Sequence, residues 1–290
     1  MIRAKQVYIQ GRLEPFSITV EDGEIVAILG ADGAGKTTVL DALSGVCDID
    51  GGERIQTHGA YMTEKSPLFA DMTLRANLKF VCDLEGLNHA RADERIRAAA
   101  ALTDIVPYLD KPAASLALPI QRRCALALAL LFEETNLYLD EPTRDLESGD
   151  ALRLRRTLRQ LRADKAILLC TRSVTEAERL ADRIYLLQDG KLIAQCEPGR
   201  LDGLAADLHT MRARIRATEE EALSAGAQRV EKSPVAGCVD AFFACDDGES
   251  LLRRLMDQQL RVVEFSPAPL DVDDMICNLD TDAFPGEAEE

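Results

Sequence analysis

The first two thirds of the chain alternate between short apolar segments and segments with helical spacing. Residues 24–29 are apolar on both faces, as a strand buried in a parallel sheet requires. A glycine-rich segment follows, and residues 36–43 then show helical spacing up to Ser44-Gly45. The other elements that this pattern predicts are strands at 16–20, 136–139 and 166–171, helices at 152–162 and 175–181, and a hairpin of 184–187 with 191–194. This alternation predicts a three-layer α/β core with a mainly parallel sheet.

One long region interrupts the alternation. Residues 72–110 are rich in Ala, Leu, Arg and Glu with helical spacing, and prolines break the pattern over 112–119. Residues 121–132 then form a nearly all-apolar helix, most of which must be buried. We therefore expect an inserted helical subdomain over about 72–132.

The composition changes again near residue 206. A charged helix is predicted over 207–225, and short strands at 238–245 and 261–265 flank a helix at 249–258. These segments predict a small α+β appendage. The expected organisation is a main domain over 1–205, the appendage over 206–279, and an acidic disordered tail over 280–290.

The charge of the chain is unevenly distributed. There are 34 Lys plus Arg and 50 Asp plus Glu, a formal net charge of −16, while 47% hydrophobic residues exclude a chain that is disordered throughout. Residues 1–200 carry a net charge of −4 and residues 201–290 one of −12. The acidic surplus argues against a nucleic-acid partner, which basic residues would have to hold.

Neither a membrane span nor a zinc site is expected from the sequence. No apolar run approaches the roughly 20 residues that span a bilayer, and the first residues lack the apolar core of a secretory signal. The eight cysteines contain no Cys-x-x-Cys pair. This spacing disfavours zinc and predicts small buried thiols in a reducing cytosol.

A phosphate-binding loop follows the first buried strand. The pattern Gly-x4-Gly-Lys-Thr lies between a buried strand and a helix, which is the context that gives it meaning. Glycines let backbone N–H groups turn inward around an anion, and the helix N-terminus favours phosphate. Lys36 is expected to reach the β/γ-phosphate oxygens and the Thr37 hydroxyl to bind Mg²⁺. The predicted nucleotide-binding residues of the loop are Gly30, Ala31, Asp32, Gly33, Ala34, Gly35, Lys36, Thr37 and Thr38.

Two carboxylates end the apolar strand at residues 136–139. Asp140 stands where an acidic residue of nucleotide hydrolases holds Mg²⁺. Glu141 is the next residue and can act as general base toward an attacking water. Together with the upstream loop, this pair predicts nucleotide hydrolysis.

These motifs together resemble the nucleotide-binding subunit of an ATP-binding cassette (ABC) transporter over roughly residues 1–200. Residues 31–38 are similar to the first motif of that family. Residues 140–147 (Asp-Glu-Pro-Thr-Arg-Asp-Leu-Glu) resemble its Asp-Glu-Pro-Thr-Ser-Gly-Leu-Asp. Residues 175–184 and 189–194 look like its closing helix and hairpin.

The resemblance has several implications for fold and ligands. It implies a P-loop NTPase core with an antiparallel β subdomain and the helical subdomain, and it implies ATP with Mg²⁺. It also implies that Tyr8 stacks on adenine, although a core or surface tyrosine is the alternative. Residues 61–78 are most similar to the drug-export branch of the family, and the end of the appendage fits such exporters as well.

Three positions depart from the family pattern. The signature Leu-Ser-Gly-Gly-Gln is replaced by Leu116-Ala-Leu-Pro-Ile120, which lacks the hydroxyl, one N–H and the glycines. The Q-loop glutamine that helps to hold Mg²⁺ is Glu64, and the switch histidine is Arg172, which cannot relay protons. We expect the charges of Glu64 and Arg172 to compensate, giving firm MgATP binding and slow turnover; simple drift beside a hydrolysing partner is the alternative.

The expected function is that of an ATPase subunit, cytoplasmic and peripheral at the inner face of the cell membrane. It is expected to dimerise around MgATP, to pair with a second, intact cassette, and to drive a separate permease, in the direction of export. A regulatory or scaffold subunit with little hydrolysis is the leading alternative. A cassette protein acting on ribosomes or DNA is a third, but its usual second cassette and basic surface are missing here.

Overall fold

The computed structural model describes residues 1–64, 67–201, 210–227, 229–245 and 247–267. The chain divides into two compact units, the first built from Met1–Pro198 and the second beginning at Gly199. The predicted boundary at 205/206 lies outside the described residues, as does the predicted tail at 280–290.

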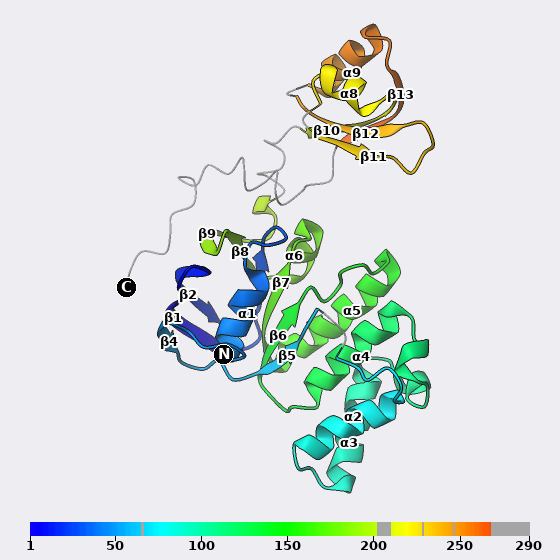
Figure 1. The fold of residues 1–290 in the computed structure, drawn as a ribbon. Coiled ribbons are helices and arrows are strands. Elements are labelled where there is room, and N and C mark those ends of the chain that lie inside the picture. The colour runs from blue at the N-terminus through cyan, green and yellow to red at the C-terminus, as the bar shows by residue number, and fades with distance from the viewer. Residues whose placement is uncertain (65–66, 202–209, 228, 246, 268–290) are drawn as a thin grey trace. The chain divides into compact units, whose positions relative to one another are not determined.

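A six-stranded sheet forms the centre of the first unit, with the order β5-β6-β7-β3-β8-β9 (Figure 1). Its strands are β3 (Ile25–Leu29), β5 (Ala60–Met62), β6 (Asn136–Asp140), β7 (Ala166–Thr171), β8 (Arg183–Gln188) and β9 (Lys191–Cys196). All neighbouring strands are parallel except β8 and β9, which form the predicted hairpin. Every residue of β3, β6 and β7 is buried, because helices or a second sheet cover both faces.

Helices cover the two faces of this sheet. Helix α1 (Lys36–Ser44) contacts β6 and β7, and it ends where Gly45 adopts a left-handed conformation. Helices α5 (Ser148–Leu161) and α6 (Val174–Leu180) cover the opposite face (Figure 1). The predicted three-layer α/β core is therefore confirmed.

A three-stranded antiparallel sheet shares a hydrophobic core with α1. It consists of β1 (Ile2–Ile9), β2 (Leu13–Val20) and β4 (Gly51–Arg54). The apolar pattern indicated only 16–20 within it. Irregular register between Ala4 and Ile9 breaks the alternation of β1, and β4 carries two glycines and two charges, so neither strand shows a clear period of two.

The inserted helical part has its own core. It contains α2 (Leu74–Leu84), α3 (His89–Leu102) and α4 (Leu118–Leu130), with the 3₁₀ turns Val106–Tyr108 and Ala113–Ser115 between α3 and α4. A further 3₁₀ turn, Arg162–Asp164, follows α5. Helix α4 begins three residues earlier than expected, because Pro119 lies in its first turn, where a missing N–H costs nothing.

The second unit has a β-α-β-β-α-β order with four antiparallel strands arranged β11-β12-β10-β13, a ferredoxin-like topology. Its elements are β10 (Thr210–Arg216), α8 (Glu219–Ser224), β11 (Arg229–Lys232), β12 (Val239–Ala244), α9 (Gly248–Asp257) and β13 (Arg261–Pro267). The predicted helix over 207–225 is wrong for 210–216, which form β10. Ala213 and Ile215 are fully buried at a spacing of two, so burial of alternate residues outweighs the charged composition.

No helix among the described residues is long and apolar enough to cross a bilayer. Seven of the cysteines lie in the described part of the chain, and none of these forms a disulfide. Five of them are buried, as the sequence predicted.

Candidate functional site

The glycine-rich loop connects β3 to α1 at the carboxyl end of the central sheet. Gly33 and Gly35 have φ angles of 88° and 104°, a conformation that side chains rarely adopt, so glycine is required at both positions. The Lys36 ammonium donates hydrogen bonds to the carbonyl oxygens of Gly30 at 2.9 Å and Ala31 at 2.8 Å. Lys36 is buried, and the loop therefore folds around its side chain.

The turn between β8 and β9 supports the loop from outside. The N–H of Gly190 donates to the carbonyl oxygen of Ala34 at 2.8 Å, and its own carbonyl accepts from the N–H of Glu14 at 2.9 Å. Gly190 has a φ of 80°, and a Cβ there would lie 2.2 Å from the carbonyl oxygen of Arg12. The loop and the antiparallel sheet are thus both tied to this glycine.

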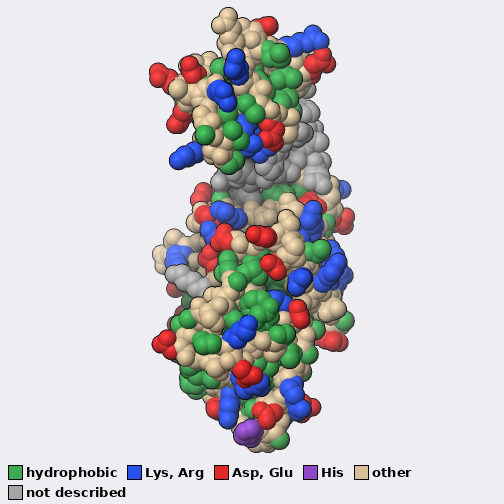
Figure 2. Space-filling view, turned by 90° about the vertical axis from the view of Figure 1, so that its right-hand side faces the viewer, with side chains coloured by type: hydrophobic (Ala, Val, Ile, Leu, Met, Phe, Trp, Pro, Cys, Tyr) green, Lys and Arg blue, Asp and Glu red, His purple; other side chains and the backbone are tan. Residues whose placement is uncertain are grey.

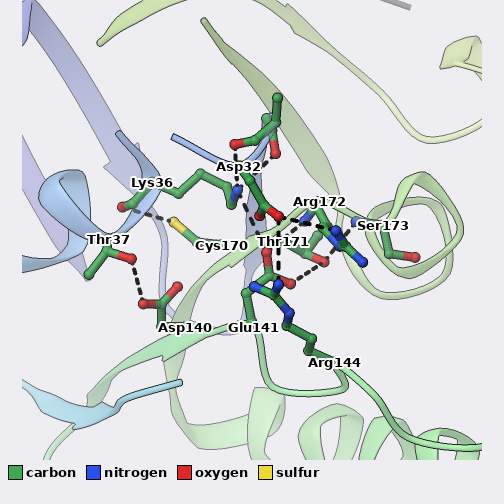
Figure 3. Close-up of polar contacts among 12 residues, drawn as sticks. Asp32, Lys36, Thr37, Asp140, Glu141, Arg144, Cys170, Thr171, Arg172 and Ser173 are labelled. Carbon is green, nitrogen blue, oxygen red and sulfur yellow. Dashed lines mark hydrogen bonds and ion pairs between the residues drawn. The ribbon is translucent and has the colours of Figure 1, made fainter. Parts of the chain in front are cut away.

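The end of β6 brings Asp140 to the start of α1. The Thr37 hydroxyl donates to the Asp140 Oδ2 at 2.7 Å (Figure 3). Burial raises the pKa of Asp140, and the hydrogen bond from Thr37 opposes that shift. Both side chains come together as the sequence predicted.

The donor set suits Mg²⁺. Thr37, Asp140 and Glu64 offer oxygen ligands beside the phosphate-binding loop, and hard cations prefer oxygen. No group of three or more His, Cys, Asp or Glu side chains able to hold a metal is present in the described part of the chain. Two carboxylates and one hydroxyl leave coordination positions for water and substrate phosphates, which Mg²⁺ usually keeps.

Glu141 occupies the centre of the site and is buried. Its carboxylate accepts hydrogen bonds from the backbone N–H of Arg172 at 3.0 Å and the hydroxyl of Thr171 at 3.3 Å, and it lies 3.6 Å from the Lys36 ammonium (Figure 3). Burial raises its pKa, while Lys36 and Arg144 oppose the shift. A carboxylate held in this way has the raised basicity that a general base needs.

The two charged replacements have separate partners. The Arg172 guanidinium lies 3.1 Å from the Asp32 carboxylate, and the Glu64 carboxylate lies 2.8 Å from the guanidinium of Arg144. The expected compensation between Glu64 and Arg172 is therefore not a direct pair in this structure, because each meets a different residue of opposite charge.

One pocket of about 260 Å³ collects most of these residues. It is lined by Asp32, Gly33, Gly35, Lys36, Thr37, Thr38, Glu64, Asp140, Glu141 and Arg144. Gly30, Ala31 and Ala34 contribute to the loop through their backbone bonds, and Arg172 reaches Glu141 through its N–H.

Tyr8 and Arg144 differ from the sequence interpretation. The ring of Tyr8 lies against Gly51, where a Cβ would be 2.3 Å from Cε1, and Tyr8 is not among the pocket-lining residues. Stacking on adenine stays a prediction. Arg144 lines the pocket and was not singled out from the sequence. The signal was present, because a charged residue stands where the resembled motif has serine.

The start of α4 carries the altered signature. Ala117 is the N-cap residue and makes no side-chain cap hydrogen bond, and Pro119 in the first turn has no N–H. Ala117 and Leu118 are exposed. This helix end therefore presents methyl and isobutyl groups where a phosphate-binding end would present a hydroxyl and free N–H groups.

Comparisons with known proteins place this site in a family. The family described as "ABC transporter" matches residues 13–144. The aliphatic sulfonates import ATP-binding protein SsuB 2 of Pseudomonas savastanoi is 35% identical over 70% of this chain and 76% of its own length. The ABC transporter ATP-binding protein NatA of Bacillus subtilis is 29% identical over 61% of this chain and 78% of its own.

Coverage differs among the relatives. The chain spans only 11% of the rat ATP-binding cassette sub-family A member 17, with 30% identity over 63% of this chain. Among solved structures, an ATP-binding subunit of an ABC transporter superposes with a TM-score of 0.60 at 23% identity, over 70% of this chain and 92% of its own. The dimeric bacterial cassette MJ0796 also gives 0.60, at 20% identity, over 68% and 98%.

The fold and the pocket define a P-loop nucleotide-binding protein of the ATPase class. The chain is 35% identical to SsuB 2 and covers 76% of its length. It therefore belongs to the ATP-binding subunits of ABC transporters. The family and fold class predicted from the sequence are thereby confirmed.

Proposed function

We propose that this chain binds MgATP in the pocket beside Lys36, hydrolyses it slowly, and works as one of two unequal cassettes that energise a separate membrane permease. The observation that carries nucleotide hydrolysis is the gathering of Lys36, Thr37, Asp140 and Glu141 around one cavity.

Each of these residues has a role in the proposed reaction. Lys36 and the loop N–H groups hold the β- and γ-phosphates, and Glu141 orients a water and accepts its proton. Thr37, Asp140 and Glu64 are the residues that would hold Mg²⁺, which neutralises phosphate charge when it is bound. The N–H of Arg172 and the hydroxyl of Thr171 keep the Glu141 carboxylate in place.

Pairing with a second, different cassette is supported by the start of α4. In the family this helix end serves the nucleotide of the partner subunit. Here Ala117 and Pro119 leave it without the hydroxyl and without one N–H. In a homodimer both sites would face this altered end, whereas an intact partner would complete the site of this chain. The dimeric structure of MJ0796 shows that a cassette of this fold can dimerise.

Docking to a permease is supported by exposed aromatic side chains. Phe69, which precedes α2, is 52% exposed, and Phe80 of α2 is 39% exposed. Their ring centroids lie 5.2 Å apart. Leu84, also on α2, is 70% exposed. Figure 2 shows hydrophobic side chains between charged ones on the face over the helical part of the first unit. Exposed apolar groups of this kind mark protein-interaction surfaces. Such docking would hold the chain at the inner face of the cell membrane.

Export is the direction that residues 61–78 and the appendage support, through their resemblance to drug exporters. Several relatives, such as SsuB 2, are named as import proteins. Transport measured in vesicles with the cognate permease distinguishes the two directions. Accumulation of substrate on the side that carries the cassettes would contradict export.

The test of unequal pairing restores the start of α4. The triple variant Ala117→Ser, Leu118→Gly, Pro119→Gly leaves the buried Ile120 in place. We expect the unmodified chain alone to hydrolyse ATP slowly and the triple variant to gain at least about tenfold in turnover, since one lost transition-state hydrogen bond costs 10²-fold or more. Adding Glu141→Gln to the triple variant should abolish the gain. Fast turnover of the unmodified chain that the triple variant does not increase would contradict unequal pairing.

A regulatory subunit with no productive hydrolysis is the second candidate. The altered helix end and the charged Arg172 favour it. Glu141→Gln in the complete transporter separates the two, because unchanged turnover of the complex would show that this site binds ATP without hydrolysing it. The proposed function requires part of the turnover to be lost.

A further inference from the structure

Among the residues that the structure describes, Arg144 is the one arginine that lines the nucleotide pocket. Its guanidinium lies 2.8 Å from the Glu64 carboxylate and 3.6 Å from that of Asp32. Asp32 belongs to the phosphate-binding loop, and Glu64 follows β5. The guanidinium therefore connects two sides of the cavity into which Lys36 also points (Figure 3).

The backbone after β6 places this side chain. Glu141 and Asp145 have φ angles of 46° and 62°, which non-glycine residues rarely adopt, and two successive turns close from Arg144 N–H to the Glu141 carbonyl and from Leu146 N–H to the Thr143 carbonyl. Strained conformations of this kind persist where the surrounding structure over-determines them, often at functional sites. The turns keep Arg144 beside the general base.

We propose that Arg144 binds the terminal phosphate of ATP in the same subunit and exchanges its carboxylate partners Glu64 and Asp32 for that phosphate. The inference rests on the proposed ATP-binding function. Arg144 would then distinguish ATP from ADP. The family pattern Asp-Glu-Pro-Thr-Ser-Gly-Leu-Asp has serine at this position, and serine carries no charge to bind a phosphate.

The ion pairs of Arg144 with Glu64 and Asp32 contribute little free energy, so the guanidinium can exchange them for another anion. The side chains of Glu64 and Asp32 are 39% and 56% exposed, and ion pairs with exposed carboxylates contribute little because water competes for both charges. A terminal phosphate offers three acceptor oxygens on one group and a larger negative charge than a single carboxylate. The planar guanidinium can engage two of these oxygens at once. One phosphate can therefore replace the exposed carboxylates as the partner of Arg144.

Arg144 is better placed for this role than Arg172. Arg172 is 51% exposed, meets Asp32 and is not among the pocket-lining residues, whereas Lys36 already has its proposed place on the β- and γ-phosphates.

The test compares affinities for ADP and for a non-hydrolysable ATP analogue, both with Mg²⁺, on the full chain by calorimetry. Arg144→Ser should weaken the ATP analogue about tenfold, the worth of one charge-assisted hydrogen bond, and leave ADP within about twofold. Arg144→Lys should lie between, because it keeps the charge and loses the bidentate geometry. Arg156→Ser is the matched control, an exposed arginine of α5 that does not line the pocket.

A second variant pair separates phosphate binding from simple neutralisation of Glu64. If Arg144 only screens that carboxylate, Arg144→Ser combined with Glu64→Gln will bind the ATP analogue as tightly as Glu64→Gln alone, and the inference is overturned. Persistent weakening in the double variant supports it. Equal weakening for ADP and the analogue in Arg144→Ser also overturns it while ATP binding stands. An unmodified chain that binds neither nucleotide removes the proposed function itself.

Discussion

At the scale of single residues, the buried carboxylate of Glu141 links catalysis to pH. Its pKa is raised, so the basic form is lost at a higher pH than for a free glutamate. We expect kcat/KM for ATP to fall as the pH falls through this raised pKa, which a pH–rate profile of the transporter measures. An acid limb positioned at the pKa of ordinary glutamate would contradict the prediction.

The raised pKa of Glu141 also affects stability. Activity needs the ionised carboxylate, whereas the folded state is stabilised by the protonated one. Because the folded state raises the pKa, the stabilising contribution of protonated Glu141 is present below the unfolded pKa and is lost as the pH rises through the folded one. Glu141→Gln stays neutral, so its Tm should exceed that of the unmodified chain by more at pH 8 than at acidic pH. Glu94→Gln, at an exposed position of α3, should show no such difference.

Most individual site residues could be predicted because they belong to the glycine-rich motif or to the Asp-Glu pair after β6. The carboxyl ends of parallel strands meet at one edge of a sheet, and this rule places Asp140 beside Lys36 and Thr37. The partner of Glu64 could not be predicted. It depends on how the strained turns after Glu141 direct Arg144, and a strained φ leaves no mark on hydrophobic periodicity.

At the scale of elements, the β8–β9 hairpin is the support on which the phosphate-binding loop depends. Gly190→Ala introduces a Cβ 2.2 Å from the Arg12 carbonyl oxygen at a φ of 80°. We expect it to lower the free energy of unfolding by about 1–3 kcal/mol and to weaken nucleotide binding, because the backbone shift that relieves this contact moves the N–H of residue 190 away from the Ala34 carbonyl. Chemical denaturation and calorimetry measure the two effects.

Gly11, between β1 and β2, provides the matched control for Gly190→Ala. It has a φ of 72°, and a Cβ there would meet nothing within 4 Å. Gly11→Ala should therefore carry the conformational cost alone and leave nucleotide affinity unchanged. Equal nucleotide affinity in the two variants would show that the hairpin does not support the loop.

Elements with a clean period were predicted and irregular ones were not. The central strands β3, β6 and β7 are apolar on both faces and were recognised at once. Strand β1 gives no clear pattern because its register shifts. The sequence of β10 predicts a helix, because its arginines hide the alternation of Ala213 and Ile215. Short strands whose stability comes from their neighbours carry too little local signal.

At the scale of the whole molecule, the two units have separate hydrophobic cores. Phe243 is fully buried in the core of the second unit, and Leu29 is fully buried at the end of β3. Phe243→Ala should destabilise the second unit by about 3–5 kcal/mol and leave ATP affinity unchanged. Leu29→Ala, about 2–5 kcal/mol, should weaken ATP binding as well. Loss of nucleotide affinity in Phe243→Ala would show that the units are coupled.

The order of strands also has a kinetic consequence. Lys36 follows β3 and Glu141 follows β6, and β7 lies between these two strands in the sheet. The pocket therefore forms only when β3 pairs with β7 and β7 with β6, although β3 and β6 are more than a hundred residues apart in sequence. Contacts this distant in sequence make folding slow. We expect the pocket to be complete only after the folding transition state. Nucleotide should then leave the refolding rate of the first unit unchanged and slow its unfolding, so that bound ATP prolongs the lifetime of the native state in the cell.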